Sequence, residues 1–253
     1  MKNPEFPQDP KKRRALVILN RRDFDGLSHR EGGADLLYSD ESIAVAWPYE
    51  VESPVVQALA ERGLLRAGAV LLQSPFDPND YVDAADAANE FAIAKHLHFC
   101  RVCQHLGARR VKAEQREVIT EKGRVVAQLD VAAPVAMATA KGTDDRYSKL
   151  DASLRIEVTA DGGEPNVEGA LDYVRRYGLG GDRLITDLIE SARIKTNRTK
   201  SQQLTIQLST EAKRSLEVAT RIAVPAYLTA VEANLKVVRQ QKSEFSVTVR
   251  VDF

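Results

Sequence analysis

The densest group of chemically reactive side chains in this sequence lies between residues 96 and 105. This stretch, His96-Leu-His-Phe-Cys-Arg-Val-Cys-Gln-His105, holds both cysteines of the chain and three of its four histidines. Thiolates and imidazoles are the usual protein ligands of zinc. At ~100° per residue, a helix would place His96, Cys100 and Cys103 on one face. It would place His98 and His105 on the opposite face, so these five side chains cannot all bind one ion.

His96, Cys100 and Cys103 are therefore the candidate metal ligands. A structural zinc site needs four ligands, and the remaining histidine, His29, lies in a distant loop that could supply the fourth. The same helix face is otherwise apolar, and a free cysteine behaves as a small buried hydrophobe. Core packing and thiol redox chemistry are thus the competing interpretations. We predict that both cysteines are buried, reduced and metal-free, and we expect no cofactor.

A second candidate site is the basic segment Ser191-Ala-Arg-Ile-Lys-Thr-Asn-Arg-Thr-Lys-Ser201. Its cations alternate with hydroxyl and amide side chains, all of which can bond phosphate oxygens. No aromatic residue is interleaved, so stacking on bases is not implied. The alternative is an ordinary solvated loop. The residues predicted to contact phosphate or a polyanion are Arg193, Lys195, Arg198 and Lys200.

Catalytic motifs are not evident in the sequence. The glycine-rich turn Tyr177-Gly-Leu-Gly-Gly-Asp182 follows a predicted helix rather than a strand, and it matches neither the P-loop nor the dinucleotide-binding fingerprint. It is typical of a break between two helices, with Asp182 as a cap. No serine, histidine and aspartate have the spacing of a known triad. The sequence therefore favours a protein that is not an enzyme, and no motif marks it as a member of a known family.

The composition predicts an ordinary globular protein. Hydrophobic residues make up 43% of the 253 residues and charged residues 28%, and the formal net charge is zero. A neutral chain has no global attraction for nucleic acid or anionic membranes. Two cysteines cannot form a disulfide framework, and neither a secretory signal nor a transmembrane run is present. We expect a soluble protein of the cytoplasm.

The elements that would position these residues follow from periodicity and capping. We expect residues 1–12 to be a flexible tail and residues 13–253 to form a single α+β domain, with a sub-boundary near 107–111 as the alternative. Residues 21–40 are polar and predict a long loop. The predicted helices run from about 54 to 62, from 79 to 106, from 166 to 177, from 182 to 194 and from 210 onward, the last broken by Pro225.

Alternating apolar residues predict most of the strands. The hairpin 111–120 and 124–131 would carry outward-facing charges, Arg116 among them, and residues 150–158 would form a further alternating strand. The clearest case is the end of the sequence, where Phe245, Val247, Val249, Val251 and Phe253 alternate with polar residues. The other predicted strands are 15–19, 43–47, 69–72 and 203–208.

These patterns predict an α+β fold with a mainly antiparallel sheet from the middle and C-terminal strands, packed against amphipathic helices. Our leading hypothesis for function is a non-catalytic intracellular protein that binds a protein partner or itself as a homo-oligomer. One alternative is a membrane-acting effector that refolds its amphipathic hairpins. Another is a nucleic-acid-associated protein or enzyme that uses the basic segment 193–200.

Overall fold

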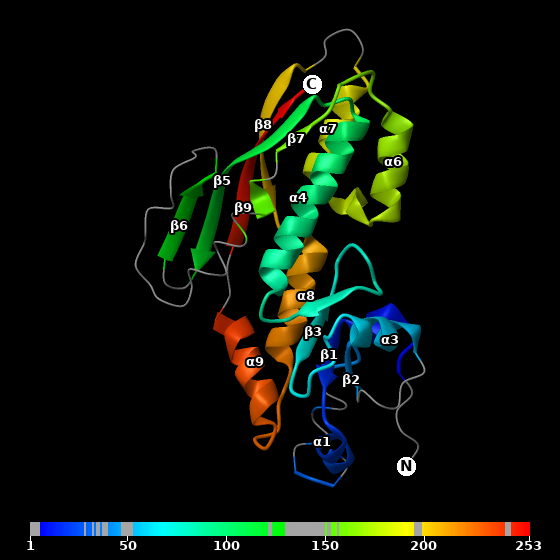
Figure 1. The fold of residues 1–253 in the computed structure, drawn as a ribbon, viewed down its shortest axis with the longest axis vertical. Coiled ribbons are helices and arrows are strands. Elements are labelled where there is room, and N and C mark those ends of the chain that lie inside the picture. Colours follow the sequence, from blue (N-terminus) through cyan, green and yellow to red (C-terminus); the bar gives the residue numbers. More distant parts are fainter. Residues whose placement is uncertain are drawn as a thin grey trace. The chain divides into compact units, whose positions relative to one another are not determined.

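The computed structural model has an α+β fold, as the sequence predicted, with two sheets that are mainly antiparallel (Figure 1). Its contacts divide the chain into two compact units, each built from two separate stretches of sequence. Unit 1 comprises Met1–Glu90 and Glu211–Lys242, and unit 2 comprises Phe91–Thr210 and Ser243–Phe253. The residues described are 6–27, 29–31, 33, 36, 40–46, 53–120, 123–129, 150, 153–155, 157–194, 199–240 and 244–253.

Unit 1 contains a sheet with the strand order β2-β1-β3-β4, in which β1 and β2 are parallel and the other neighbours antiparallel. The inner strands are apolar on both faces, as expected for strands that are covered on both sides. Every residue of β1 and β3 is buried. The strands are β1 (Ala15–Ile18), β2 (Ile43–Ala46), β3 (Val70–Gln73) and β4 (Tyr81–Asp83).

The helices of unit 1 largely begin and end where the sequence indicated. Ser53 precedes a helix with Pro54 at its first position, and the helical segment after residue 210 is interrupted around Pro225. One short helix lies at the start of the segment that was expected to be a loop. The helices are η1 (Pro10–Arg13), α1 (Arg21–Gly26), α3 (Pro54–Glu61), α8 (Thr210–Arg221) and α9 (Thr229–Gln240).

Regular structure begins within the segment that was expected to be a flexible tail. The side chain of Asp9 accepts a hydrogen bond from the backbone of Lys11 at the start of η1. The Nε2 of Gln73 donates to the carbonyl of Pro10 over 3.0 Å, which ties η1 to strand β3. Arg13 is only 3% exposed, and its guanidinium donates to the hydroxyl of Tyr81 over 2.9 Å.

The long helix α4 (Ala87–His105) starts later than predicted, because residues 81–83 form strand β4 instead. Tyr81 is wholly buried, and its hydroxyl donates to the carbonyl of Arg13 over 2.8 Å. This tertiary bond, together with backbone pairing to β3, outweighs the helical pattern of the local sequence. No helix in the described part of the chain is both long and apolar enough to cross a membrane.

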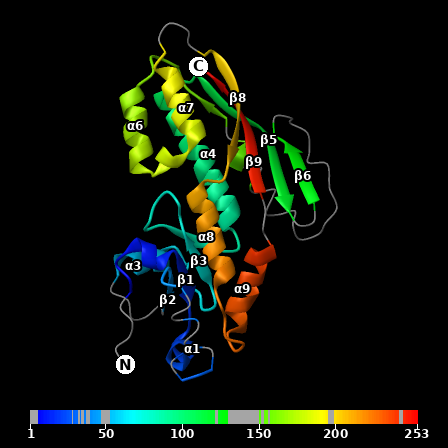
Figure 2. The same ribbon diagram turned by 180° about the vertical axis from the view of Figure 1, so that it is seen from behind.

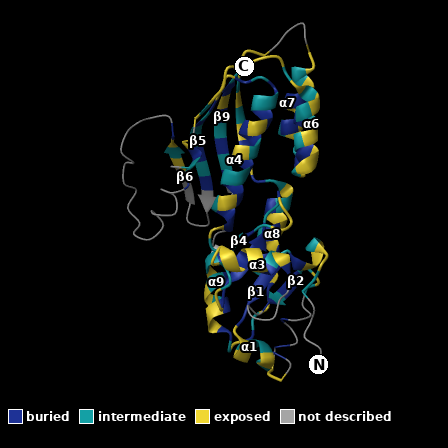
Figure 3. Cartoon of the chain, turned by 45° about the vertical axis from the view of Figure 1, so that its right-hand side comes forward, coloured by how far each residue is buried: buried dark blue, intermediate teal, exposed yellow. Residues whose placement is uncertain are grey.

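Unit 2 is built on a second sheet with the strand order β6-β5-β9-β8, to which β7 adds by pairing with β5. Helices α4, α6 and α7 lie together on one side of this sheet (Figures 1 and 2). Figure 3 shows that α6 and α7 each have a buried and an exposed side. The elements are β5 (Arg110–Thr120), β6 (Gly123–Gln128), β7 (Val158–Thr159), α6 (Val167–Arg176), η2 (Leu179–Gly181), α7 (Arg183–Ala192), β8 (Ser201–Gln207) and β9 (Glu244–Asp252).

A β-bulge in β5 corrects the prediction that Arg116 faces outward. The pairing of β5 with β9 shifts register between Ala113 and Gln115. One extra residue reverses the alternation of side chains beyond it. Val111 and Ala113 are buried before the shift, and Arg116 and Val118 are buried after it. Arg116 is therefore only 2% exposed, on the same face as the apolar core.

The predicted strand 150–158 is the second correction. Leu150, Ser153 and Leu154 are helical, and among the residues of this segment that the structure describes only Val158–Thr159 forms a strand. Leu150 and Leu154 are both buried. Residues four apart share a face in a helix as well as in a strand, so the apolar pattern at these positions fitted both structures.

The alternation predicted for the end of the chain is confirmed. Phe245, Val247, Val249 and Val251 are all buried in β9. The strand lies between β5 and β8, so its backbone is paired on both sides. Phe253 follows the strand and is half-buried.

Candidate functional site

The candidate metal ligands lie inside the core of unit 2. His96 is 1% exposed, Cys100 3% and Cys103 0%, as expected for the apolar face of α4. The Nε2 of His96 lies 3.7 Å from the Sγ of Cys100, one turn along the helix. Both thiols are free. The prediction that the two cysteines are buried is confirmed.

Burial keeps these groups in their neutral forms. It lowers the pKa of His96 to about 4, because the imidazolium ion would lose its hydration. It raises the pKa of Cys100 to about 12 for the same reason. The pKa of Cys103 is also raised, mainly by burial and further by its neighbour Cys100. A thiol in this state is neither a nucleophile nor a ready metal ligand.

The three side chains are too widely spaced along α4 to surround one ion. His96 and Cys103 are separated by two helical turns, about 10 Å along the axis. Zinc needs ligands within about 2.0–2.3 Å. Within the described ranges, no group of three or more His, Cys, Asp or Glu side chains is arranged to hold a metal. A shared helix face is therefore not enough to make His96, Cys100 and Cys103 a metal site. His29, the fourth histidine, belongs to unit 1.

The opposite face of α4 is covered by aromatic side chains of α6. The Nδ1 of His98 lies 2.8 Å from the hydroxyl of Tyr173, and its ring lies 4.6 Å from that of Tyr177. His105 packs on Tyr173 with 5.6 Å between ring centroids. Burial lowers the pKa of His98. These histidines join α4 to α6 rather than offering ligands to a metal.

The predicted polyanion-binding residues fall into three groups. Arg193 forms an ion pair with Glu190 at 3.1 Å, one turn back at the end of α7. Lys195 and Arg198 lie outside the described residues. Lys200 lines a cavity of about 450 Å³, and this cavity is the candidate site.

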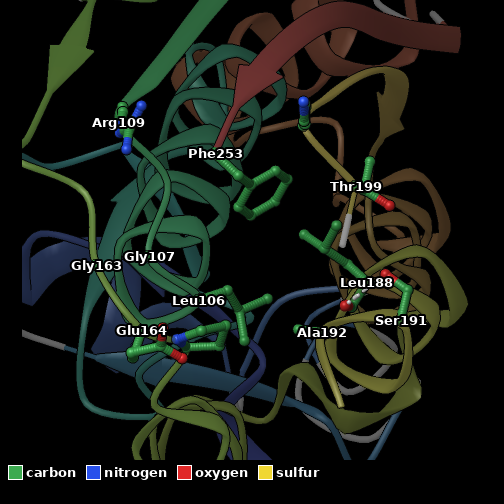
Figure 4. A pocket seen from close by; sticks show the side chains of 12 residues that line it. Leu106, Gly107, Arg109, Gly163, Glu164, Leu188, Ser191, Ala192, Thr199 and Phe253 are labelled. Atoms are coloured by element: carbon green, nitrogen blue, oxygen red, sulfur yellow. Dashed lines mark hydrogen bonds between the residues drawn. The ribbon is translucent and has the colours of Figure 1, made fainter. Parts of the chain in front are cut away.

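The cavity lies where several elements of unit 2 end (Figure 4). In that view the ring of Phe253 lies between Arg109 on one side and Leu188 and Thr199 on the other. The cavity is lined by the end of α4 (Leu106, Gly107), the start of β5 (Arg109), the segment Gly163-Glu164-Pro165, the end of α7 (Leu188, Ser191, Ala192), Thr199 and Lys200 before β8, and Phe253 after β9.

Two glycines bring the 160–166 segment against the end of α4. Gly107 adopts φ +82°, the left-handed conformation that commonly terminates helices. A Cβ at this position would collide with the carbonyl oxygen of Gly163. The contact is completed by Asn166, whose backbone N–H donates to the carbonyl of His105 over 2.8 Å. Asn166 also caps α6, so one residue fixes both helices at this end.

The charged side chains of the cavity are two cations and one carboxylate. Arg109 and Lys200 are exposed, and neither forms an ion pair with another described residue. Glu164 supplies the opposing negative charge. Hydroxyl groups come from Thr199 and Ser191, and Ser191 donates to the carbonyl of Leu188 over 3.1 Å. The side chains that line the cavity therefore carry one net positive charge.

Helix C-termini usually disfavour anions, and both α4 and α7 end at this cavity. Their last carbonyl groups, however, already accept hydrogen bonds. The N–H groups of Gly107 and Ala108 donate to the last turn of α4, and those of Arg193 and Ile194 donate to the last turn of α7. Satisfied carbonyls exert a weaker field than free ones.

Leu106, Leu188, Pro165 and the ring of Phe253 give the cavity an apolar part. A second, more open hollow of about 490 Å³ is lined by residues 160–164 and Asn166, among others, and it shares Gly107, Gly163 and Glu164 with the first. The first cavity combines apolar walls with cations at its rim. This combination suits a ligand that joins an apolar body to a negative group.

No family model, curated protein or solved structure matches this chain. The site is therefore described by its own geometry. The glycine turn at 178–181 behaves as predicted: Gly178 has φ +65°, and Asp182 accepts from the backbone of Leu184 to cap α7.

Of the residues that line the cavity, Lys200 was predicted from the sequence as a site residue, whereas Arg109, Glu164 and Phe253 were not. Glycines lie close to two of them in the sequence: Gly107 follows the predicted helix 79–106, and Gly162 and Gly163 follow the predicted strand 150–158. The sequence does not reveal that these two glycine segments touch, since 55 residues separate Gly107 from Gly162. That contact creates the cavity wall.

Proposed function

We propose that this protein acts by binding, and that the unit 2 cavity takes a negatively charged group attached to an apolar body. The observation that supports this most directly is that two cations, Arg109 and Lys200, line the same cavity as an apolar wall. A carboxylate or phosphate there would gain charge-assisted hydrogen bonds from the cations. Leu106, Leu188 and Phe253 would shield the apolar part of the ligand from water.

Binding fits the lining better than catalysis does. No histidine or cysteine is found among the described lining residues. The hydroxyl of Ser191 is already donated to a backbone carbonyl rather than to a base. A nucleophile needs an adjacent general base within hydrogen-bonding reach. The cavity therefore supports recognition of a partner or ligand, in line with the leading hypothesis from sequence.

Amide NMR titrations with hexanoate and with hexan-1-ol test this proposal. The two compounds share an apolar chain and differ in the charged group. Hexanoate should shift the signals of Gly107, Gly163 and Phe253 and should bind about tenfold more tightly than the alcohol, a difference of about 1.4 kcal/mol. Equal affinity for the two compounds would contradict the proposal.

Matched variants locate the binding. Arg109→Gln and Lys200→Gln should each weaken hexanoate binding several-fold and leave hexan-1-ol unaffected. Arg193→Gln is the control, because Arg193 is close in sequence but pairs with Glu190 and does not line the cavity. If the control variant weakened hexanoate as much as the other two, the cavity would not be the site.

The two alternatives from sequence also remain predictions. Nucleic-acid binding through the 193–200 segment should fall steeply as salt is raised. It should also be lost when Arg193, Lys195, Arg198 and Lys200 are all replaced by alanine. A membrane-acting effector should release dye from anionic liposomes.

A further inference from the structure

Strand β8 forms an edge of the unit 2 sheet, directly beside the cavity. In the described part of the chain β8 pairs with β9 alone. Natural edge strands usually carry charges, prolines or bulges that prevent another strand from pairing with them. The sequence of β8, Ser-Gln-Gln-Leu-Thr-Ile-Gln, contains no charge, proline or glycine. This edge is built of residues that accept a new strand rather than repel one.

The register identifies which backbone groups face outward. The N–H of Phe253 donates to the carbonyl of Lys200 over 2.9 Å, so these two residues form a hydrogen-bonded pair. Such pairs alternate along an antiparallel ladder, so every second residue from Lys200 bonds to β9. The N–H and C=O groups that point away from β9 belong to Ser201, Gln203, Thr205 and Gln207.

We propose that the occupant of this edge and cavity is the C-terminal segment of a partner polypeptide. The segment adds to β8 as an extended antiparallel strand, and its terminal carboxylate binds at Lys200, which directly precedes β8. The proposal rests on the function proposed above and names the ligand of that site. Addition of a strand to a sheet edge supplies backbone hydrogen bonds, while a neighbouring pocket reads the side chains.

Direction and charge favour a C-terminus over other parts of a chain. A strand antiparallel to β8 ends beside Ser201, where β8 begins, and Thr199 and Lys200 of the cavity lining immediately precede it. The terminal carboxylate thus lies next to the cation of Lys200. A parallel strand would bring its N-terminal ammonium group to the same cation, which is unfavourable. The apolar walls of the cavity suit an apolar last side chain.

A peptide library with random C-terminal heptapeptides tests the proposal. One display format leaves the carboxylate free, and the other continues the chain beyond the random segment. The free-carboxylate library should enrich peptides that end in an apolar residue, and the extended library should not. No enrichment from the free-carboxylate library, or equal enrichment from both, overturns the proposal.

Synthetic versions of the most enriched peptide then test its two contacts separately, the terminal carboxylate and the backbone pairing with β8. Fluorescence anisotropy should show at least a tenfold loss of affinity when the carboxylate is converted to an amide. N-methylation of the peptide at successive positions should weaken binding at every second residue, because alternate N–H groups face β8. An amide that binds as well as the acid, or N-methylation effects without this alternation, overturns the proposal.

The full chain distinguishes failure of this inference from failure of the proposed function. If hexanoate binds at Arg109 and Lys200 but no C-terminal peptide does, the cavity takes a small ligand and only the peptide proposal fails. Light scattering then tests whether the full chain forms a dimer through the β8 edge. A dimer that forms without peptide and that the enriched peptide dissociates would assign the β8 edge to a second copy, and this also overturns the proposal.

Discussion

Lys95 in the middle of α4 forms an ion pair with Asp182, the N-cap residue of α7, and the two side chains are only 7% and 13% exposed. Asp182 also accepts a hydrogen bond from the backbone of Leu184 over 3.1 Å. One carboxylate thus starts α7 and attaches it to α4. The other end of α7 supplies Leu188, Ser191 and Ala192 to the cavity. This ion pair therefore helps to place one wall of the candidate site.

Replacing Lys95 by methionine should destabilise the protein by about 3–5 kcal/mol, because it leaves the carboxylate of Asp182 buried without its cation. Urea denaturation measures the loss. Arg175→Met is the matched control, since Arg175 pairs with Asp172 on the surface at 2.8 Å with both side chains well exposed. Removal of such a pair costs less than about 1 kcal/mol. Similar costs for both variants would show that burial of the Lys95 pair has no energetic consequence.

The buried imidazole of His96 should make the protein sensitive to acid. Its pKa is about 4 in the folded chain and 6.5 as a free group. Between these values the unfolded chain binds a proton that the folded chain excludes, so stability falls as the pH drops from 6.5 towards 4. The difference corresponds to about 3 kcal/mol.

His96→Leu should remove this part of the acid sensitivity, as measured by urea denaturation at pH 7 and pH 4.5. His105→Gln is the control, because His105 lies on the other face of α4 against Tyr173. An unchanged pH dependence in His96→Leu would contradict the assignment to this ring.

The two thiols should be inert in the folded protein. Cys100 and Cys103 are buried, and their raised pKa values keep them protonated at neutral pH. A thiol reagent should label both rapidly in denaturant and very slowly in buffer. Protein purified without chelator should contain no zinc, and near-stoichiometric zinc would contradict this. Cys103→Ser should cost about 1–3 kcal/mol, because it places a hydroxyl in an apolar site.

Local sequence signals predicted much of the fold. The predicted helix starts near residues 54 and 166 and the predicted break at Pro225 are confirmed. Each depends on a residue that acts within a few positions: Pro54 at the start of α3, Asn166 at the cap of α6 and Pro225 between α8 and α9. The strict alternation from Phe245 to Val251 likewise allows only a period of two. Such signals depend on local backbone chemistry and need no knowledge of the partner element.

The failures arose where a distant partner decides the structure. The bulge that buries Arg116 is a property of the pairing between β5 and β9, and the sequence of β5 alone does not predict it. Tyr81 joins a strand because Arg13, 68 residues earlier, binds its hydroxyl. The cavity has the same origin, since Gly107 and Gly163 meet only in the folded chain. Sequence could name Lys200 as a candidate but could not place Arg109 in the same cavity.

Strand β9 should be indispensable, because it lies between β5 and β8 and is paired along its whole length. Each of Phe245, Val247, Val249 and Val251 contributes roughly 1.5–3 kcal/mol by burial. A domain of this size has a net stability of about 5–15 kcal/mol. Deletion of residues 244–253 should therefore abolish folding of unit 2, as measured by circular dichroism melts.

Point variants within β9 test whether the buried face of this strand stabilises the protein. Val249→Thr keeps the side-chain shape but buries a hydroxyl, and it should cost about 1–3 kcal/mol, whereas Thr248→Val on the opposite face should be nearly neutral.

If residues 13–253 unfold as a single domain, the deletion of residues 244–253 should remove the whole cooperative transition, because each unit is built from two stretches of the same chain. A deletion variant that melts near the temperature of the parent would show that β9 is dispensable. A surviving transition from unit 1 alone would instead divide the chain into two independent domains.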